Sequence, residues 1–271
     1  MIFTDAHLRK KRWSELDRDS RQAFWNYIII VEMLPDVSDV LVKNIFERIN
    51  RNSRKLVPQE LRHAKYDGWF VTTAEAEAEK QEWKDLGIVT PARIKRMADV
   101  QFISELISTT INKAVEGFDQ DALDELYAGY EDLAEKQNFV EDDFRNEFET
   151  VKQYIMQIKS KELTLIETFK VQSHFYTLWS YLIVEKDRRL PIDEFVPRYL
   201  QFMTDVSAMI AKAREREEIE VKANASPEQR AVASYALNSR GASTDMTPRQ
   251  ARHDALVIVM HGAAVPAHEN R

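Results

Sequence analysis

The chain has 271 residues, of which 44% are hydrophobic and 31% are charged, enough for one large domain or two smaller ones with a buried core. Its net charge of −7 argues against a protein that coats nucleic acid, and the lack of cysteine excludes disulfides, thiolate zinc sites and cysteine nucleophiles. Six glycines and eight prolines are few for a turn-rich β-protein, so the composition favours helices.

Neither a secretory signal nor a membrane span is predicted. The first twelve residues carry charges without an apolar core, and the most apolar runs, residues 27–31 and 175–184, fall far short of the ~20 residues that a span needs. We therefore expect a cytoplasmic protein with no membrane partner.

The N-terminal part predicts a short polar helix at residues 13–23 and then a strand at residues 24–32. This strand is aromatic and β-branched, and no second segment of the sequence offers it a good partner. We therefore expect its sheet to be incomplete or completed by another chain. Ser38 then caps a predicted helix whose apolar face includes Phe46 and which ends near Asn50.

The rest of the chain predicts successive helices. Prolines mark the starts of five of them, and in three places a cap residue (Thr90, Ser226 or Thr247) stands before the proline, while Gly68, Gly87 and Gly117 suit helix ends. The predicted helices begin near Pro58, Ala74, Thr90, Leu123, Phe144, Ile166, Leu190, Ser226 and Thr247. Pro197 is expected to divide or kink the helix that begins near Leu190.

Two motifs lie close together in the sequence, F-E-R-I-N at residues 46–50 and E-L-R-H-A at residues 60–64, followed by Gly68. Together they resemble the middle of the GmrSD-type restriction endonuclease family, firmly over residues 13–70 and more loosely up to Met260. The resemblance implies a mainly α fold, a multi-helix bundle domain preceded by a remnant of a ParB/sulfiredoxin-like α/β domain. The expected domains are the remnant at residues 1–70, the helical domain at residues 71–262 and a disordered tail at residues 263–271.

The same resemblance supplies the candidate site residues. Asn50 and Arg62 are the catalytic candidates, and the residues expected to contact a nucleic acid or nucleotide are Phe46, Asn50, Arg51, Arg54, Lys55 and Arg62. In the family an F-x-x-x-N motif lies beside a D-G-Q-Q-R motif, which this sequence lacks and which lies upstream of the position that matches Met1. We therefore expect an incomplete site that is inactive by itself. A complete family member would use a nucleoside triphosphate and Mg²⁺, whereas no cofactor is expected for this chain alone.

Each candidate also has a simpler structural interpretation. Phe46 lies on an apolar helical stripe, and asparagine suits a helix end, as Asn50 does here. Arg62 could instead form an ion pair that docks two helices. Glu60 could instead complete the N-terminus of a helix. No histidine has metalloprotease or ββα-metal spacing, so no metal site is predicted.

Three hypotheses about function follow. The first is the helical specificity or scaffold region of a bacterial anti-phage, modification-dependent restriction-type protein, acting on DNA with a complementing N-terminal half or a nuclease subunit. The second is a non-enzymatic protein-interaction module of a defence or mobile-element cassette. The third is an autonomous nuclease, which is disfavoured because no carboxylate cluster of the metal-binding type accompanies Asn50, Arg62 and His63.

Overall fold

The computed structural model describes residues 13, 16–28, 56–136, 138–216 and 224–262, and within them it contains helices and no strand. The chain divides into two compact units, Met1–Ser53 and Arg54–Arg271. The predicted mainly helical fold is therefore confirmed for the described residues. The ParB/sulfiredoxin-like remnant is not seen and stays a prediction.

In the first unit the described residues form α1 (Arg18–Trp25). Asp17 caps this helix, because its side chain accepts a hydrogen bond from the backbone N–H of Ser20 at 2.7 Å. The strand predicted from residue 24 is wrong at its start, since Phe24 and Trp25 are the last residues of α1 and Tyr27 and Ile28 are in no strand. The N-terminal cap favours a helix here, whereas the β-propensity of aromatic residues depends on their context. The remainder of the predicted strand lies outside the described residues.

The second unit contains the remaining helices. In its first half they are α3 (Pro58–Lys65), α4 (Trp69–Ala78), α5 (Gln81–Asp85), α6 (Pro91–Ile94), α7 (Ala98–Asn112), α8 (Gln120–Gly129) and the 3₁₀ turn η2 (Leu133–Glu135). In its second half they are α9 (Glu141–Lys161), η3 (Leu163–Leu165), α10 (Ile166–Phe169), α11 (Gln172–Val184), η4 (Lys186–Arg188), α12 (Ile192–Arg216), α13 (Pro227–Asn238) and α14 (Met246–His261). Among the described residues, none of these helices has both the length and the apolar character to cross a membrane.

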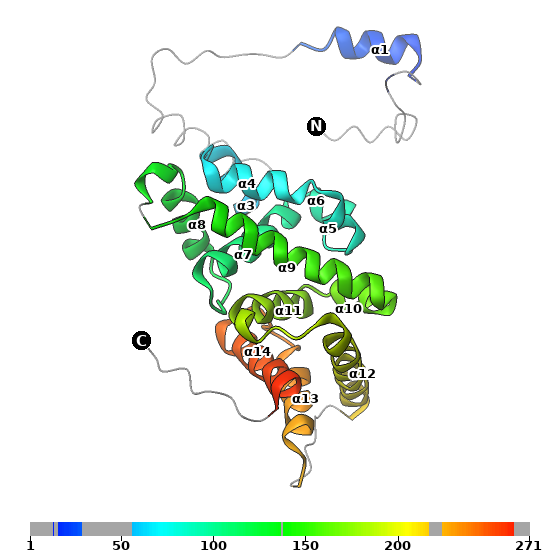
Figure 1. Ribbon diagram of the computed structural model, residues 1–271. Helices are drawn as coiled ribbons and strands as arrows, with labels where there is room; N and C mark the ends of the chain where they lie inside the picture. The colour runs from blue at the N-terminus through cyan, green and yellow to red at the C-terminus, as the bar shows by residue number, and fades with distance from the viewer. Residues whose placement is uncertain (1–12, 14–15, 29–55, 137, 217–223, 263–271) are drawn as a thin grey trace. The chain divides into compact units, whose positions relative to one another are not determined.

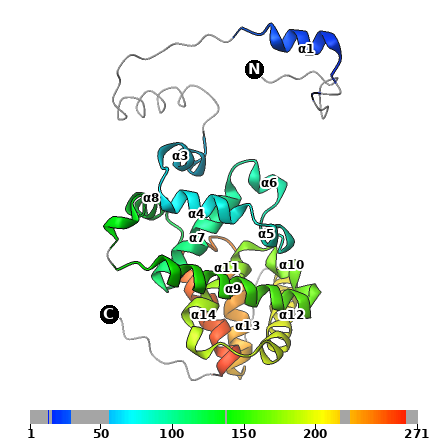
Figure 2. The ribbon, with the colours of Figure 1, turned by 45° about the horizontal axis from the view of Figure 1, so that its top comes forward.

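Helix α9 runs across the second unit and packs on both α7 and α11 (Figures 1 and 2). Its first turn is acidic and its last turn carries Lys159 and Lys161, which suits the helix dipole at both ends. Beyond it, α13 and α14 lie side by side, and α11 and α12 contact them. The core is aromatic: Trp83, Phe148 and Trp179 are in ring contact, with centroids 4.7–6.1 Å apart.

Several helix boundaries differ from the predictions because the chain breaks where no glycine or proline marks it. The predicted helix at 74–86 is replaced by α4 and α5, and the predicted helix at 166–184 by α10 and α11. Met97 and Lys113 adopt left-handed backbone conformations and bound α7, so Gly117 does not end that helix. Pro197 lies inside α12, which continues through it. Gly68 precedes α4 as its N-cap and does not end α3.

Candidate functional site

Of the predicted site residues, the structure describes Arg62. The other five, Phe46, Asn50, Arg51, Arg54 and Lys55, lie outside the described residues. The compact unit that contains Arg62 begins at Arg54, so α3 packs with the helices that follow residue 71.

Helix α3 starts as the sequence predicts. Pro58 occupies its first turn, and the side chain of Glu60 accepts a hydrogen bond from the backbone N–H of Val57 at 2.7 Å. Glu60 thus completes the helix N-terminus. The helical spacing then puts Gln59 and Arg62 on one face, where they are 0% and 2% exposed.

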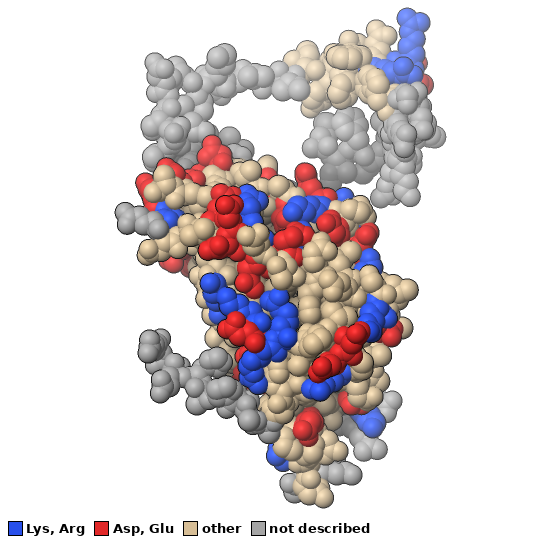
Figure 3. Space-filling view, in the orientation of Figure 1, with Lys and Arg blue, Asp and Glu red and all other residues tan. Residues whose placement is uncertain are grey.

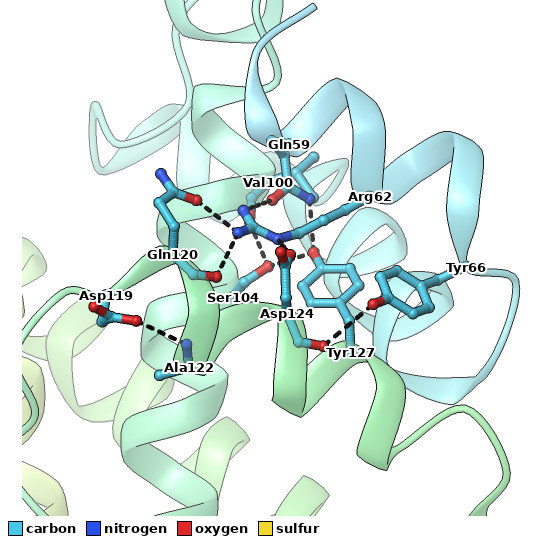
Figure 4. Close-up of polar contacts among 10 residues, drawn as sticks. All are labelled: Gln59, Arg62, Tyr66, Val100, Ser104, Asp119, Gln120, Ala122, Asp124 and Tyr127. Atoms are coloured by element: carbon cyan, nitrogen blue, oxygen red, sulfur yellow. Dashed lines mark hydrogen bonds and ion pairs between the residues drawn. The ribbon is translucent and has the colours of Figure 1, made fainter. Parts of the chain in front are cut away.

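The Arg62 guanidinium is bound by acceptors from α3 and α8 (Figure 4). Nε donates to Asp124 Oδ1 at 2.6 Å, and Nη2 donates to the backbone and side-chain oxygens of Gln120 at 2.9 and 2.6 Å. Nη1 contacts Gln59 Oε1 at 3.3 Å. Every nitrogen of this buried cation has an acceptor, which is what a buried charge requires.

Tyr127 closes the group that we call the Arg62 cluster, which comprises Gln59, Arg62, Ser104, Gln120, Asp124 and Tyr127. Its hydroxyl accepts from Gln59 Nε2 at 2.6 Å and lies 2.8 Å from Ser104 Oγ on α7 (Figure 4). Burial raises the pKa of the Tyr127 phenol above its ordinary value. The cluster therefore holds α3 against α7 and α8.

His63, which the autonomous-nuclease hypothesis would use, lies outside this cluster. Its ring Nδ1 is 2.6 Å from Glu75 Oε1 on α4, and its side chain is 57% exposed. The partners of Arg62 were not predicted from the sequence. Their one local signal is that Gln120 and Asp124, four residues apart, share a face of α8.

The opposite side of α8 lines a cleft of about 300 Å³. The residues that border this α8 cleft come from α7, α8, α11, α14 and the loops beside them. They are Glu105, Ser108, Asn112, Glu116, Gly117, Phe118, Asp119, Ala122, Leu123, Glu125, Leu126, Tyr130, Lys136, Tyr176 and Arg249.

An ion pair between Arg249 and Glu105 forms part of the cleft lining. The Arg249 guanidinium carbon lies 3.7 Å from the ring centroid of Tyr176, and Nη1 donates to the backbone oxygen of Glu116 at 3.0 Å. Both members of the pair are shielded from solvent, with 4% and 11% of their side chains exposed. Burial raises the pKa of the Glu105 carboxyl, while Arg249 opposes this shift.

Glu116 is fixed at the edge of the cleft by both its backbone and its side chain. The Tyr176 hydroxyl lies 3.0 Å from its backbone nitrogen and from its backbone oxygen. Its carboxylate accepts hydrogen bonds from Ser108 at 2.5 Å and Asn112 at 2.6 Å. These contacts tie the loop that follows α7 to α7 and α11 and place one carboxylate at the cleft.

The described residues contain no group of three or more histidine or acidic side chains placed to hold a metal ion. On the face that Figure 3 shows, acidic and basic side chains are interspersed, and neither kind of charge covers the face.

Comparison with known proteins gives no family: no family model, no curated protein and no solved structure matches the chain.

Proposed function

We propose that this chain is the helical scaffold region of a modification-dependent restriction-type protein similar to the GmrSD family, and that it acts on DNA. The segment of residues 46–55 would make the nucleic-acid contacts, through Phe46, Asn50, Arg51, Arg54 and Lys55. The observation that carries the proposal is the Arg62 cluster, which anchors α3 to α7 and α8. This helix begins at Pro58, three positions after Lys55.

In this proposal Arg62 is a positioning residue. A site works when the residues beside it are held rigidly, and a buried arginine with an acceptor for each nitrogen provides such an anchor. Cationic side chains that contact phosphates set the register of a protein on DNA without reading its sequence. Arg51, Arg54 and Lys55 are assigned that role.

Asn50 has no acid–base chemistry near neutral pH, so its contribution would be to donate and accept hydrogen bonds. Proton transfer, together with a nucleoside triphosphate and Mg²⁺, would be supplied by a complementing chain or a nuclease subunit. This arrangement is part of the proposal and rests on the family resemblance.

DNA binding by the full chain tests the proposal. Fluorescence anisotropy would follow a labelled duplex, with and without modified bases, across a series of salt concentrations. The triple variant Arg51→Glu, Arg54→Glu and Lys55→Glu should weaken binding, and the slope of log affinity against log salt should fall by about 0.9 for each phosphate that is no longer neutralised.

A matched control reverses three exposed lysines of the second unit, Lys84, Lys161 and Lys170. If both triple variants lose affinity equally, the binding is general charge attraction and the proposed site is wrong. If the wild-type chain folds and binds neither duplex, the alternative of a protein-interaction module replaces this proposal. The acidic lining of the α8 cleft supports that alternative, because it suits a basic protein partner better than DNA.

A further inference from the structure

The α8 cleft carries a negative balance of charge. Two cations, Lys136 and Arg249, border it together with four carboxylates, those of Glu105, Glu116, Asp119 and Glu125. With all six groups ionised the lining has a net charge of −2, and the buried carboxylate of Glu105 is already matched by Arg249. The outer part of the cleft, with Glu116, Asp119 and Glu125, therefore attracts a positive group.

The two tyrosine rings that border the cleft already hold cations of the chain itself. Arg249 lies 3.7 Å from the centroid of Tyr176, and the ammonium group of Lys136 lies 4.5 Å from the centroid of Tyr130. Cations over aromatic faces gain from the ring quadrupole, and the gain rises as water is excluded. Tyr130 is 9% exposed, and the position of the Lys136 ammonium group over its ring is called here the Tyr130 seat.

Lys136 occupies that seat without a carboxylate partner, because no ion pair involves it among the described residues. It follows the single turn η2, and its Nζ lies 3.1 Å from where a Cβ on Gly129 would be. Lys136 therefore marks a position that an ammonium group fits, against the ring of Tyr130 and beside Gly129.

A second feature of the lining calls for an oxygen acceptor. Arg249 is 4% exposed, and its Nε is buried with no hydrogen-bond partner among the described residues. A buried donor without a partner is costly, and such groups are usually satisfied by water or by a ligand. A ligand that combines an alkylammonium group with a carbonyl oxygen would satisfy both the carboxylates and this donor.

We propose that the α8 cleft binds a lysine side chain of a partner polypeptide, with its ammonium group between Tyr130 and Glu125 and a backbone carbonyl near Arg249. Lys136 is then an internal competitor that the ligand displaces. The shared chemistry is the alkylammonium group, for which a free polyamine is the other source. The proposal is independent of DNA binding, because none of the cleft residues belongs to the segment of residues 46–55.

Calorimetry on the full chain at low ionic strength tests this site with three probes. They are a blocked Gly-Lys-Gly peptide, the same peptide with norleucine in place of lysine, and 1,5-diaminopentane. We expect saturable binding of the lysine peptide and binding of the norleucine peptide that is at least about fivefold weaker, since the latter has no charge for the carboxylates and the ring. Binding of the diamine as tight as that of the lysine peptide would overturn the assignment to a polypeptide, because it would show that the backbone carbonyl adds nothing.

Two variants make opposite changes. Glu125→Gln should weaken the lysine peptide up to about fivefold, because it removes one exposed carboxylate. Lys136→Gln should strengthen it by a similar factor, because it removes the competing cation. A merely structural role for Lys136 would give weaker binding, so the sign of this effect decides between the two roles.

Asp121→Asn is the matched control, since Asp121 is exposed on the same helix but does not border the cleft. It should leave the affinity unchanged. The proposal is overturned if the norleucine peptide binds as tightly as the lysine peptide, if Asp121→Asn weakens binding as much as Glu125→Gln, or if Lys136→Gln fails to strengthen it.

Discussion

The ammonium group of Lys152 on α9 lies 2.7 Å from the carboxylate of Glu77 on α4, and both are shielded from solvent. Glu77 also accepts a hydrogen bond from Trp83 Nε1 at 2.9 Å, and its other oxygen lies 2.6 Å from Lys80. Lys152 is 1% exposed and has a second carboxylate, that of Glu149, at 2.7 Å. This group of charges is a buried polar link between α4 and α9.

Replacing Lys152 by methionine should destabilise the second unit by about 3 kcal/mol, because it leaves the carboxylate of Glu77 without its main buried partner. The free energy of unfolding from urea titration checks this value. Lys161→Met is the control: Lys161 pairs with Asp193, but these side chains are 43% and 83% exposed, so its loss should cost under about 1 kcal/mol. Equal losses in the two variants would show that the buried pair adds nothing beyond an exposed one.

The stability of the protein should fall as the pH drops from about 6.5 to about 4, in part through His174. Burial lowers the pKa of His174 from 6.5 to about 4, and Arg252 adds to this effect. The unfolded chain therefore takes up a proton in this range before the folded chain does, so the stability present above pH 6.5 is lost on acidification. One proton accounts for a slope of at most about 1.4 kcal/mol per pH unit.

His174→Gln should flatten this part of the stability profile, measured by urea unfolding at several pH values. His174 Nδ1 lies 3.2 Å from the Tyr235 hydroxyl, and glutamine retains a polar group there. The control is His63→Gln, since His63 is 57% exposed. A variant profile parallel to that of the wild type between pH 6.5 and 4 would rule out His174 as the titrating group.

The sequence predicts helix starts better than helix ends in this chain. Pro58, Pro91 and Pro227 each occupy the first turn of a helix, and Thr90 and Ser226 cap two of them through their side chains. Such signals lie within four residues of each other, so they can be read locally. The breaks at Met97 and Lys113 cannot be predicted locally, because these residues adopt left-handed conformations that their side chains do not favour.

The candidate sites depend even more on distant residues. A motif singles out Arg62, but its acceptors Gln120 and Asp124 lie 58 and 62 residues further along the chain. Glu105 and Arg249 are separated by 144 residues, and no local pattern connects them. A sequence shows which side chains are capable of a contact, whereas the fold decides which of them meet.

The contact between Arg62 and Asp124 should carry measurable coupling energy. Arg62→Met alone should cost about 2–3 kcal/mol, because Gln59, Gln120 and Asp124 lose a shared donor, although Asp124 is 48% exposed and can be rehydrated. Asp124→Asn keeps an acceptor and should cost less. A double-mutant cycle by urea unfolding should give a coupling of about 1 kcal/mol. Strict additivity of the two losses would mean that Asp124 does not stabilise the buried cation.

Gly68 should tolerate no side chain, for a reason of space and not of backbone conformation. Its φ is −80°, which any residue adopts, but a Cβ would lie 2.2 Å from the backbone oxygen of Glu131 and 2.5 Å from its Cα. Backbone atoms cannot swing aside as a flexible side chain can, so the loop after α8 would have to move. We expect Gly68→Ala to cost about 2–3 kcal/mol in urea unfolding.

The variant Gly241→Ala separates this effect from backbone strain. Gly241 has a φ of +68° and no atom near its Cβ position, so this substitution should cost only about 1 kcal/mol. A loss at Gly68 no larger than that at Gly241 would show that the start of α4 and the loop after α8 are not packed this closely.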